Sequence, residues 1–153
     1  MEIACETRAI SFTERNFMDA DISLEDARAF FANDKFAAEA CGCRIVEAAC
    51  GHAVCEFDIA DIHKNGFGSV MGGAIFTLAD FALAVACNIG ETPTVSVCNS
   101  IEFMHVAKGS RLVATATADR SGRSLGFYTV EVADELGTKV AKMTATCSRK
   151  PAE

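Results

Sequence analysis

The spacing of hydrophobic residues along the chain predicts two helical segments, each followed by alternating strands. Behind Ser23, a plausible N-cap residue, apolar side chains recur at helical spacing and predict a helix from about residue 24: Leu24, Ala27, Phe30 and Phe31. Asp34 is expected to cap a further turn that runs to Ala40 and ends at Gly42. Residues 1–22 show weak periodicity and are expected to form an N-terminal lead-in.

Alternation of apolar and polar residues predicts six strands. Two are expected between Cys43 and Ile59, with a turn near Gly51. After residue 91 the alternation predicts four more, the first of which carries these apolar side chains on one face: Val95, Val97, Ile101 and Phe103. The last three are expected over residues 112–118, 125–132 and 139–147. We expect these four strands to form an antiparallel meander.

An apolar segment from Gly73 to Ile89 separates the two groups of strands and predicts a long buried helix. It is slightly short for a membrane span, and a charge at its middle would cost roughly 2.5 to 3.5 kcal/mol on insertion. One twisted sheet of six strands could curl around such a helix. The sequence therefore predicts an α+β fold, with a single sheet wrapped around a central helix.

Asp80 is the one carboxylate inside this helix, and burial of an unpaired charge is costly. On a helical wheel it falls on a narrow stripe with these residues: Gly73, Thr77, Ala84, Cys87 and Asn88. The stripe is too narrow for a simple solvent face. We expect it to line a crevice or a subunit contact.

Composition limits the possible functions. The chain has 153 residues, a net charge of −7 and no run of basic residues, so it is expected to be one domain that does not bind nucleic acid. Eight cysteines without a Cys-x-x-Cys pair, and an N-terminus unlike a signal peptide, favour the reducing cytoplasm. A zinc site at Cys50, His52 and Cys55 is conceivable, but core packing explains these cysteines better and no metal is expected.

The loop and the start of the long helix carry a recognisable motif. Asn65-Gly66, Met71-Gly72-Gly73, the run from Phe76 to Asp80, and Ala86-Cys87-Asn88 together resemble the hotdog-fold acyl-CoA thioesterases of the phenylacetyl-CoA thioesterase-like (PaaI-type) subfamily. The resemblance implies a thioesterase domain over residues 23–150 that hydrolyses an acyl-CoA without a cofactor. It also implies a homodimer or a dimer of dimers.

The resemblance assigns a role to four residues. Asp80 matches the carboxylate that activates water or attacks the thioester, and Gly72 matches the residue whose backbone N–H polarises the thioester carbonyl. Asn65 matches a side chain that helps to hold that carbonyl, and Ser96 matches a hydroxyl that orients the water. In the family these groups meet across a dimer interface.

Further residues are expected to bind the substrate: Met71, Gly73, Thr77 and Arg123, with Phe76, Phe81 or Met104 bounding the acyl pocket. Glycine at position 73 allows close approach to the backbone, and Arg123 near a turn could bind coenzyme A phosphates. Met71 departs from the family, in which many relatives have histidine.

Simpler interpretations stay open for several of these residues. Asp80 could be a structural carboxylate, Asn65 could serve only the turn, and Ser96 could be an ordinary strand residue. His63 is expected to be a surface polar group. The alternatives for the whole protein are a non-catalytic acyl-CoA-binding module and a hotdog hydratase or dehydratase.

Overall fold

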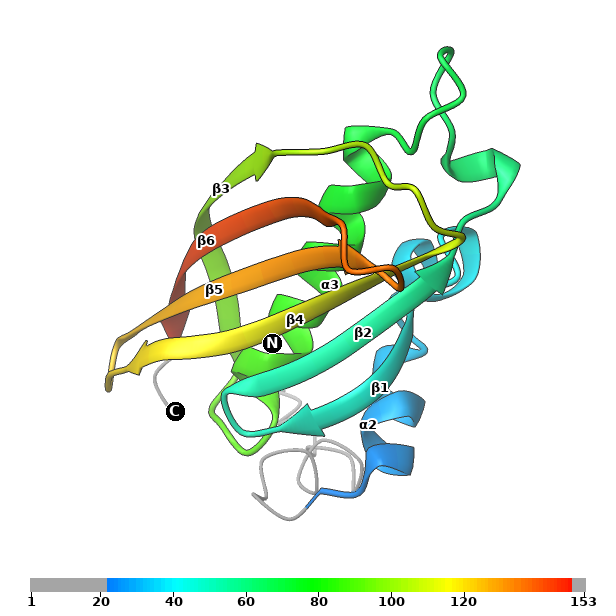
Figure 1. Ribbon diagram of the computed structural model, residues 1–153. Helices are drawn as coiled ribbons and strands as arrows, with labels where there is room; N and C mark the ends of the chain where they lie inside the picture. The colour runs from blue at the N-terminus through cyan, green and yellow to red at the C-terminus, as the bar shows by residue number, and fades with distance from the viewer. Residues whose placement is uncertain (1–21, 150–153) are drawn as a thin grey trace, which may run out of the picture.

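One antiparallel sheet of six strands curls around a long helix, as predicted (Figure 1). The computed structural model describes residues 22–149. The helices and helical turns are α2 (Leu24–Phe31), η1 (Phe36–Ala40), η2 (Asp61–His63) and α3 (Gly72–Asn88). The strands are β1 (Arg44–Ala49), β2 (His52–Asp58), β3 (Thr94–Phe103), β4 (Arg111–Ser121), β5 (Leu125–Asp134) and β6 (Lys139–Arg149). The predicted lead-in lies outside the described residues, apart from Ile22.

Small side chains allow the sheet to pack closely on α3. Ala79, Ala82 and Ala86 of the helix are fully buried, beside Leu78 and Leu83. Burial of each leucine stabilises the fold by about 1.5 to 3 kcal/mol. The long helix is therefore held by its apolar surface, and only a narrow part of it is left for polar groups.

The short helix α2 begins at the predicted N-cap, Ser23, whereas the helical turn η1 does not begin at the predicted cap, Asp34. The Ser23 hydroxyl accepts a hydrogen bond from the Asp26 amide over 3.1 Å. Gly42 ends the next segment in the left-handed region, with a φ of +65°. Among the described residues no side chain caps η1, where the N-cap residue is Lys35, so the predicted Asp34 cap is wrong. The Asp34 side chain lines a cavity instead.

The predicted meander is correct only for β4, β5 and β6. The strand order is β1-β2-β4-β5-β6-β3, so β3 pairs with β6 at the edge of the sheet and not with β4. Residues 104–110 connect β3 to β4 across the ends of β6 and β5 (Figure 1). Three strand spacings amount to roughly 14 Å, and seven extended residues reach roughly 23 Å, so a short loop can make the crossing.

A bulge in β3 also changes which side chains share a face. Ser96 lies opposite Cys147 and Cys98 lies opposite Thr146, so Val97 is an extra residue in the ladder. Cys147 is buried on the inner side, which puts Ser96 on that side, whereas Val95 lies opposite Ser148. The prediction that Val95 shares a face with Ile101 and Phe103 is therefore wrong, because an unpaired residue reverses the alternation.

Among the described helices, none is long and apolar enough to cross a membrane. Five of the described cysteines are buried in the core: Cys41, Cys43, Cys55, Cys87 and Cys147. Cys50 is exposed, with its thiol directed at Glu91, whereas Cys55 is fully buried on the inner face of β2. Within residues 22–149 no three metal-ligating side chains converge, so Cys50, His52 and Cys55 do not form a zinc site.

Candidate active site

The N-terminus of α3 offers two free backbone donors. Ala74 and Ile75 donate their amide hydrogens to the Met71 carbonyl, but no described residue accepts from the amides of Gly72 and Gly73. A helix N-terminus also carries a partial positive charge. A Cβ atom at Gly72 would lie 3.1 Å from the Phe103 ring. This end of the helix can therefore bind a carbonyl oxygen or an oxyanion.

Asn65 shapes the loop that precedes α3. Its side-chain oxygen accepts from the Phe67 amide over 2.9 Å and from the Ser69 amide over 3.2 Å. The Asn65 side-chain amide group makes no hydrogen bond within the described part of the chain, so it keeps its donors. Asn65 and Gly72 line one cavity of about 470 Å³, and the turn role and the expected carbonyl-binding role are compatible.

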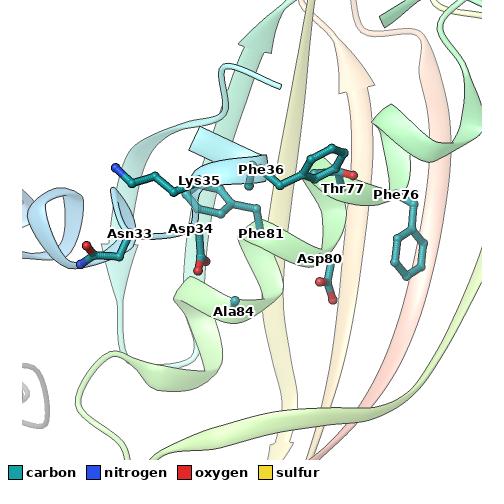
Figure 2. A pocket seen from close by; sticks show the side chains of 10 residues that line it. Asn33, Asp34, Lys35, Phe36, Phe76, Thr77, Asp80, Phe81 and Ala84 are labelled. Carbon is teal, nitrogen blue, oxygen red and sulfur yellow. The ribbon is translucent and has the colours of Figure 1, made fainter. Parts of the chain in front are cut away.

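Asp80 lies partly buried on α3, where it lines a second cavity of about 500 Å³ together with Asp34 and Thr77 (Figure 2). Phe76 and Phe81 form apolar parts of the same wall, whereas Met104 lines the cavity beside Gly72. Burial raises the pKa of Asp80, the hydrogen bond from Asn99 opposes that rise, and the negative charge of Asp34 adds to it. A carboxylate with a raised pKa is a stronger base.

Asn99 is a partner of Asp80 that the sequence did not indicate. Its side-chain amide donates to the Asp80 carboxylate over 3.2 Å, and its own oxygen is buried with no partner in the described structure. The signal lay in the alternation of β3, because Asn99 lies opposite buried Ala145 on the same face as Ile101, whose partner Met143 is also buried. An O–H group beside Asp80 would find an acceptor in this oxygen.

The remaining predicted residues fall at three places. Met71, Gly73 and Thr77 line a third cavity of about 460 Å³. The Thr77 hydroxyl donates to the Gly73 carbonyl over 2.9 Å, so its donor is used inside the helix. Ser96 is exposed on β3, and Arg123 is exposed on the β4–β5 turn.

His63 is buried, so its expected surface position is wrong. The side chain is only 5% exposed, and its ring lies 4.3 Å from the ring of Phe57. Both ring nitrogens hydrogen-bond to backbone groups, of Ala60 and of Cys41. The neighbouring apolar residue, Ile62, is 70% exposed, so no hydrophobic pattern in this loop predicted the burial of His63.

Within this one chain, the residue expected to hold the carbonyl and the residue expected to act as the base lie apart. Gly72 and Asp80 line different cavities. Eight residues of α-helix between them correspond to a rise of about 12 Å. A single carbonyl group cannot contact both in the same chain.

Comparison with known proteins gives a consistent result. A family model described as "Thioesterase superfamily" matches residues 67–141. Over 118 residues the chain is 33% identical to the acyl-coenzyme A thioesterase PaaI of Escherichia coli, covering 76% of this chain and 84% of that protein. The chain belongs to the PaaI-like hotdog thioesterases.

One further sequence relative and two solved structures are also similar to this chain. A putative esterase of Deinococcus radiodurans is 32% identical over 130 residues, covering 84% of this chain and 89% of that protein. The solved structure of the Escherichia coli PaaI protein superposes with a TM-score of 0.74 at 28% identity, covering 85% of this chain and 98% of that one. A Streptococcus mutans protein solved with acetyl CoA gives a TM-score of 0.67 at 25% identity, covering 71% of this chain and 89% of that one.

Proposed function

We propose that this PaaI-like thioesterase hydrolyses an acyl-CoA to the free acid and coenzyme A in the cytoplasm, as a homodimer or a dimer of dimers. The observation that carries the proposal is the position of Asp80, a partly buried carboxylate on a cavity with aromatic walls. The acyl-CoA activity of its relative PaaI and the acetyl CoA bound to a structural relative support the substrate class. Free thiols at all described cysteines suit a reducing compartment.

In this proposal Asp80 is the general base. A positioned carboxylate takes a proton from water as the oxygen attacks the thioester carbonyl, which typically contributes about a hundred- to ten-thousand-fold. Burial supports the role because it raises the pKa of Asp80. The unpaired oxygen of Asn99 is suited to accept the second hydrogen of the same water, and the Ser96 hydroxyl is the family's candidate for that task.

The Gly72 amide is proposed to stabilise the oxyanion that forms on the carbonyl oxygen. Its N–H has no acceptor among the described residues, and it lies in the first turn of α3, where the helix dipole is positive. Asn65 keeps its side-chain donors for the same oxygen. Met71, Gly73 and Thr77 are proposed to contact the acyl-pantetheine part, and Arg123 the phosphates.

A second subunit is proposed to complete the site. Since Gly72 and Asp80 of one chain line different cavities, we infer that the Gly72 amide of one protomer faces the Asp80 carboxylate of its partner. The free edge of β3 supports a contact between copies, because it exposes the apolar side chains of Val95, Val97 and Phe103.

Non-catalytic acyl-CoA binding is the second candidate, and Met71 is the residue that favours it. Met71 is 46% exposed at the N-cap of α3, where many relatives have histidine. The proposed carbonyl contact uses the backbone of Gly72, which this change does not remove. Both ring nitrogens of His63 are bonded to backbone groups, so this histidine is not available for the proton transfers that a hydratase requires.

The test is turnover of aromatic, short and medium acyl-CoAs, with free coenzyme A followed by chromatography. Wild type is expected to release coenzyme A, and Asp80→Asn is expected to lose about a hundred-fold or more in kcat. No turnover on any substrate would exclude the enzyme and favour the binding module. Full activity of Asp80→Asn would exclude Asp80 as the general base but not the thioesterase activity.

A matched pair of variants tests the Gly72 amide. Proline is favoured at the first position of a helix, and Met71 has the extended backbone, with ψ of 147°, that a following proline requires. Gly72→Pro removes the N–H and should lower kcat about a hundred-fold. Gly72→Ala adds the same Cβ atom against Phe103 but keeps the N–H, so it reports the steric effect alone.

A further inference from the structure

Backbone groups hold both ring nitrogens of His63, which also lines the cavity of Met71 and Gly73. The Ala60 amide donates to Nδ1 over 2.9 Å, and Nε2 lies 3.0 Å from the Cys41 carbonyl oxygen. Because an amide N–H needs an acceptor and a carbonyl needs a donor, the ring carries its proton on Nε2 and is neutral. The ring also packs against Phe57 of β2. One side chain thus joins three segments of the chain.

The backbone of His63 forms the base of the loop that leads into α3. Its carbonyl accepts from the Met71 amide over 2.8 Å, and its amide donates to the Ala60 carbonyl over 3.0 Å. The next residues, Lys64 and Val70, form a bridge across the loop. Met71 directly precedes Gly72, whose amide is the free donor. Because the Met71 amide is hydrogen-bonded to the His63 carbonyl, a displacement of His63 would also move the Gly72 amide.

We propose that His63 is a positioning residue for catalysis, whose neutral ring fixes the loop base that aims the Gly72 amide at the substrate carbonyl. The inference rests on the proposed function for the role of Gly72. Without the ring, the Ala60 amide and the Cys41 carbonyl would lose their buried hydrogen-bond partner. The His63 carbonyl, which accepts from the Met71 amide, would then no longer be held in place by the side chain. Small displacements of an oxyanion donor are costly to the rate.

Three substitutions separate the contributions of the ring. His63→Phe keeps the packing on Phe57 but loses both hydrogen bonds, and we expect kcat to fall about ten- to a hundred-fold with KM within about two-fold. His63→Asn retains an acceptor for the Ala60 amide, and His63→Gln retains a donor for the Cys41 carbonyl. Both are expected to recover part of kcat.

His52 provides a matched control. Its side chain is 39% exposed and contacts Glu47 at the β1–β2 turn. The Gly51 amide of that turn donates to the Ala86 carbonyl, near the end of α3 opposite to Gly72. His52→Phe makes the same chemical change and should leave kcat unchanged. If folded His63→Phe matches wild type in kcat, the proposal is wrong. If that variant does not fold, wild-type kcat in both His63→Asn and His63→Gln overturns it equally.

Two measurements do not depend on turnover. In wild type the ring ¹⁵N spectrum should show the proton of His63 on Nε2, and amide hydrogen exchange should show protection at Met71. In His63→Asn, Met71 protection should fall by about ten-fold. A proton on Nδ1, or unchanged protection, would overturn the positioning role. Failure of wild type to hydrolyse any acyl-CoA would overturn the proposed function instead.

Discussion

At the scale of single residues, the chemistry of Asp80 depends on neighbours that act in opposite directions. After burial, which raises the pKa of Asp80, Asn99 lowers it by hydrogen bonding and Asp34 raises it by repulsion. The two neighbours come from different parts of the chain, the segment before η1 and the edge strand β3. Substitution of either neighbour should therefore change the pKa of Asp80 while Asp80 itself is kept.

Asp34→Asn is expected to move the acid limb of the pH profile of kcat/KM to lower pH. Removal of a negative charge makes ionisation of Asp80 easier, so its pKa falls and the base stays ionised in more acidic solution. Asn99→Ala should move the same limb to higher pH, because it removes the hydrogen bond that favours the carboxylate. Shifts of both variants in one direction would contradict this arrangement.

The sequence singled out Asp80 but not Asn99 or the burial of His63, for a physical reason. An acidic residue in an apolar helix is conspicuous in any single sequence. Asn99 lies between Cys98 and Ser100 on β3, and His63 lies in a loop where its partners are the backbone groups of Ala60 and Cys41. Positions that depend on register and on backbone partners are not encoded in local periodicity.

At the scale of elements, Asp134 holds the loop that carries the chain from β3 to β4. Its carboxylate is 4% exposed and accepts from four backbone amides, of Lys108, Gly109, Leu136 and Thr138. Burial alone would raise the pKa of Asp134, but the amide donors outweigh it and hold that pKa well below its usual range. The crossing loop and the β5–β6 turn are thus joined through one side chain.

Substitution of Asp134 is expected to lower the melting temperature in a graded order. Asp134→Ala removes the acceptors for four amides and should be less stable than Asp134→Asn, which keeps one acceptor oxygen. Because the folded pKa is depressed, the carboxylate stabilises the fold above about pH 4 and loses this effect as pH falls further. The difference between wild type and Asp134→Asn should therefore shrink in acid, as measured by thermal denaturation.

The elements themselves were largely predictable, and their order in the sheet was not. Periodicity located both helices and all six strands, since each buries one face. The position of β3 beside β6 follows from a loop that crosses two strand ends and from hydrogen bonds to Asp134, which leave no periodic trace. Local patterns specify elements, and long-range contacts specify their neighbours.

At the scale of the whole molecule, the proposed shared site predicts complementation between subunits. Asp80→Asn and Asn65→Ala each damage one half of the site. After the two proteins are mixed and the subunits exchanged, one site in each mixed dimer has both halves intact, so activity should return to about one quarter of wild type.

The control for this experiment is a mixture of either variant with itself, which should stay inactive. Light scattering before mixing should give at least a dimer. No recovery after proven subunit exchange, or a strictly monomeric wild type, would contradict a site built from two chains.

The place of β3 in the sheet also has a consequence for synthesis on the ribosome. Thr94 pairs with Arg149, near the end of the described chain, and β6 is the only strand within residues 22–149 that pairs with β3. During synthesis, β3 has no strand to pair with and the nearby side of α3 stays uncovered until β6 leaves the ribosome, because contacts distant in sequence form late. Stop codons within β6 would then remove the partner of two strands, so even short truncations should yield aggregated protein.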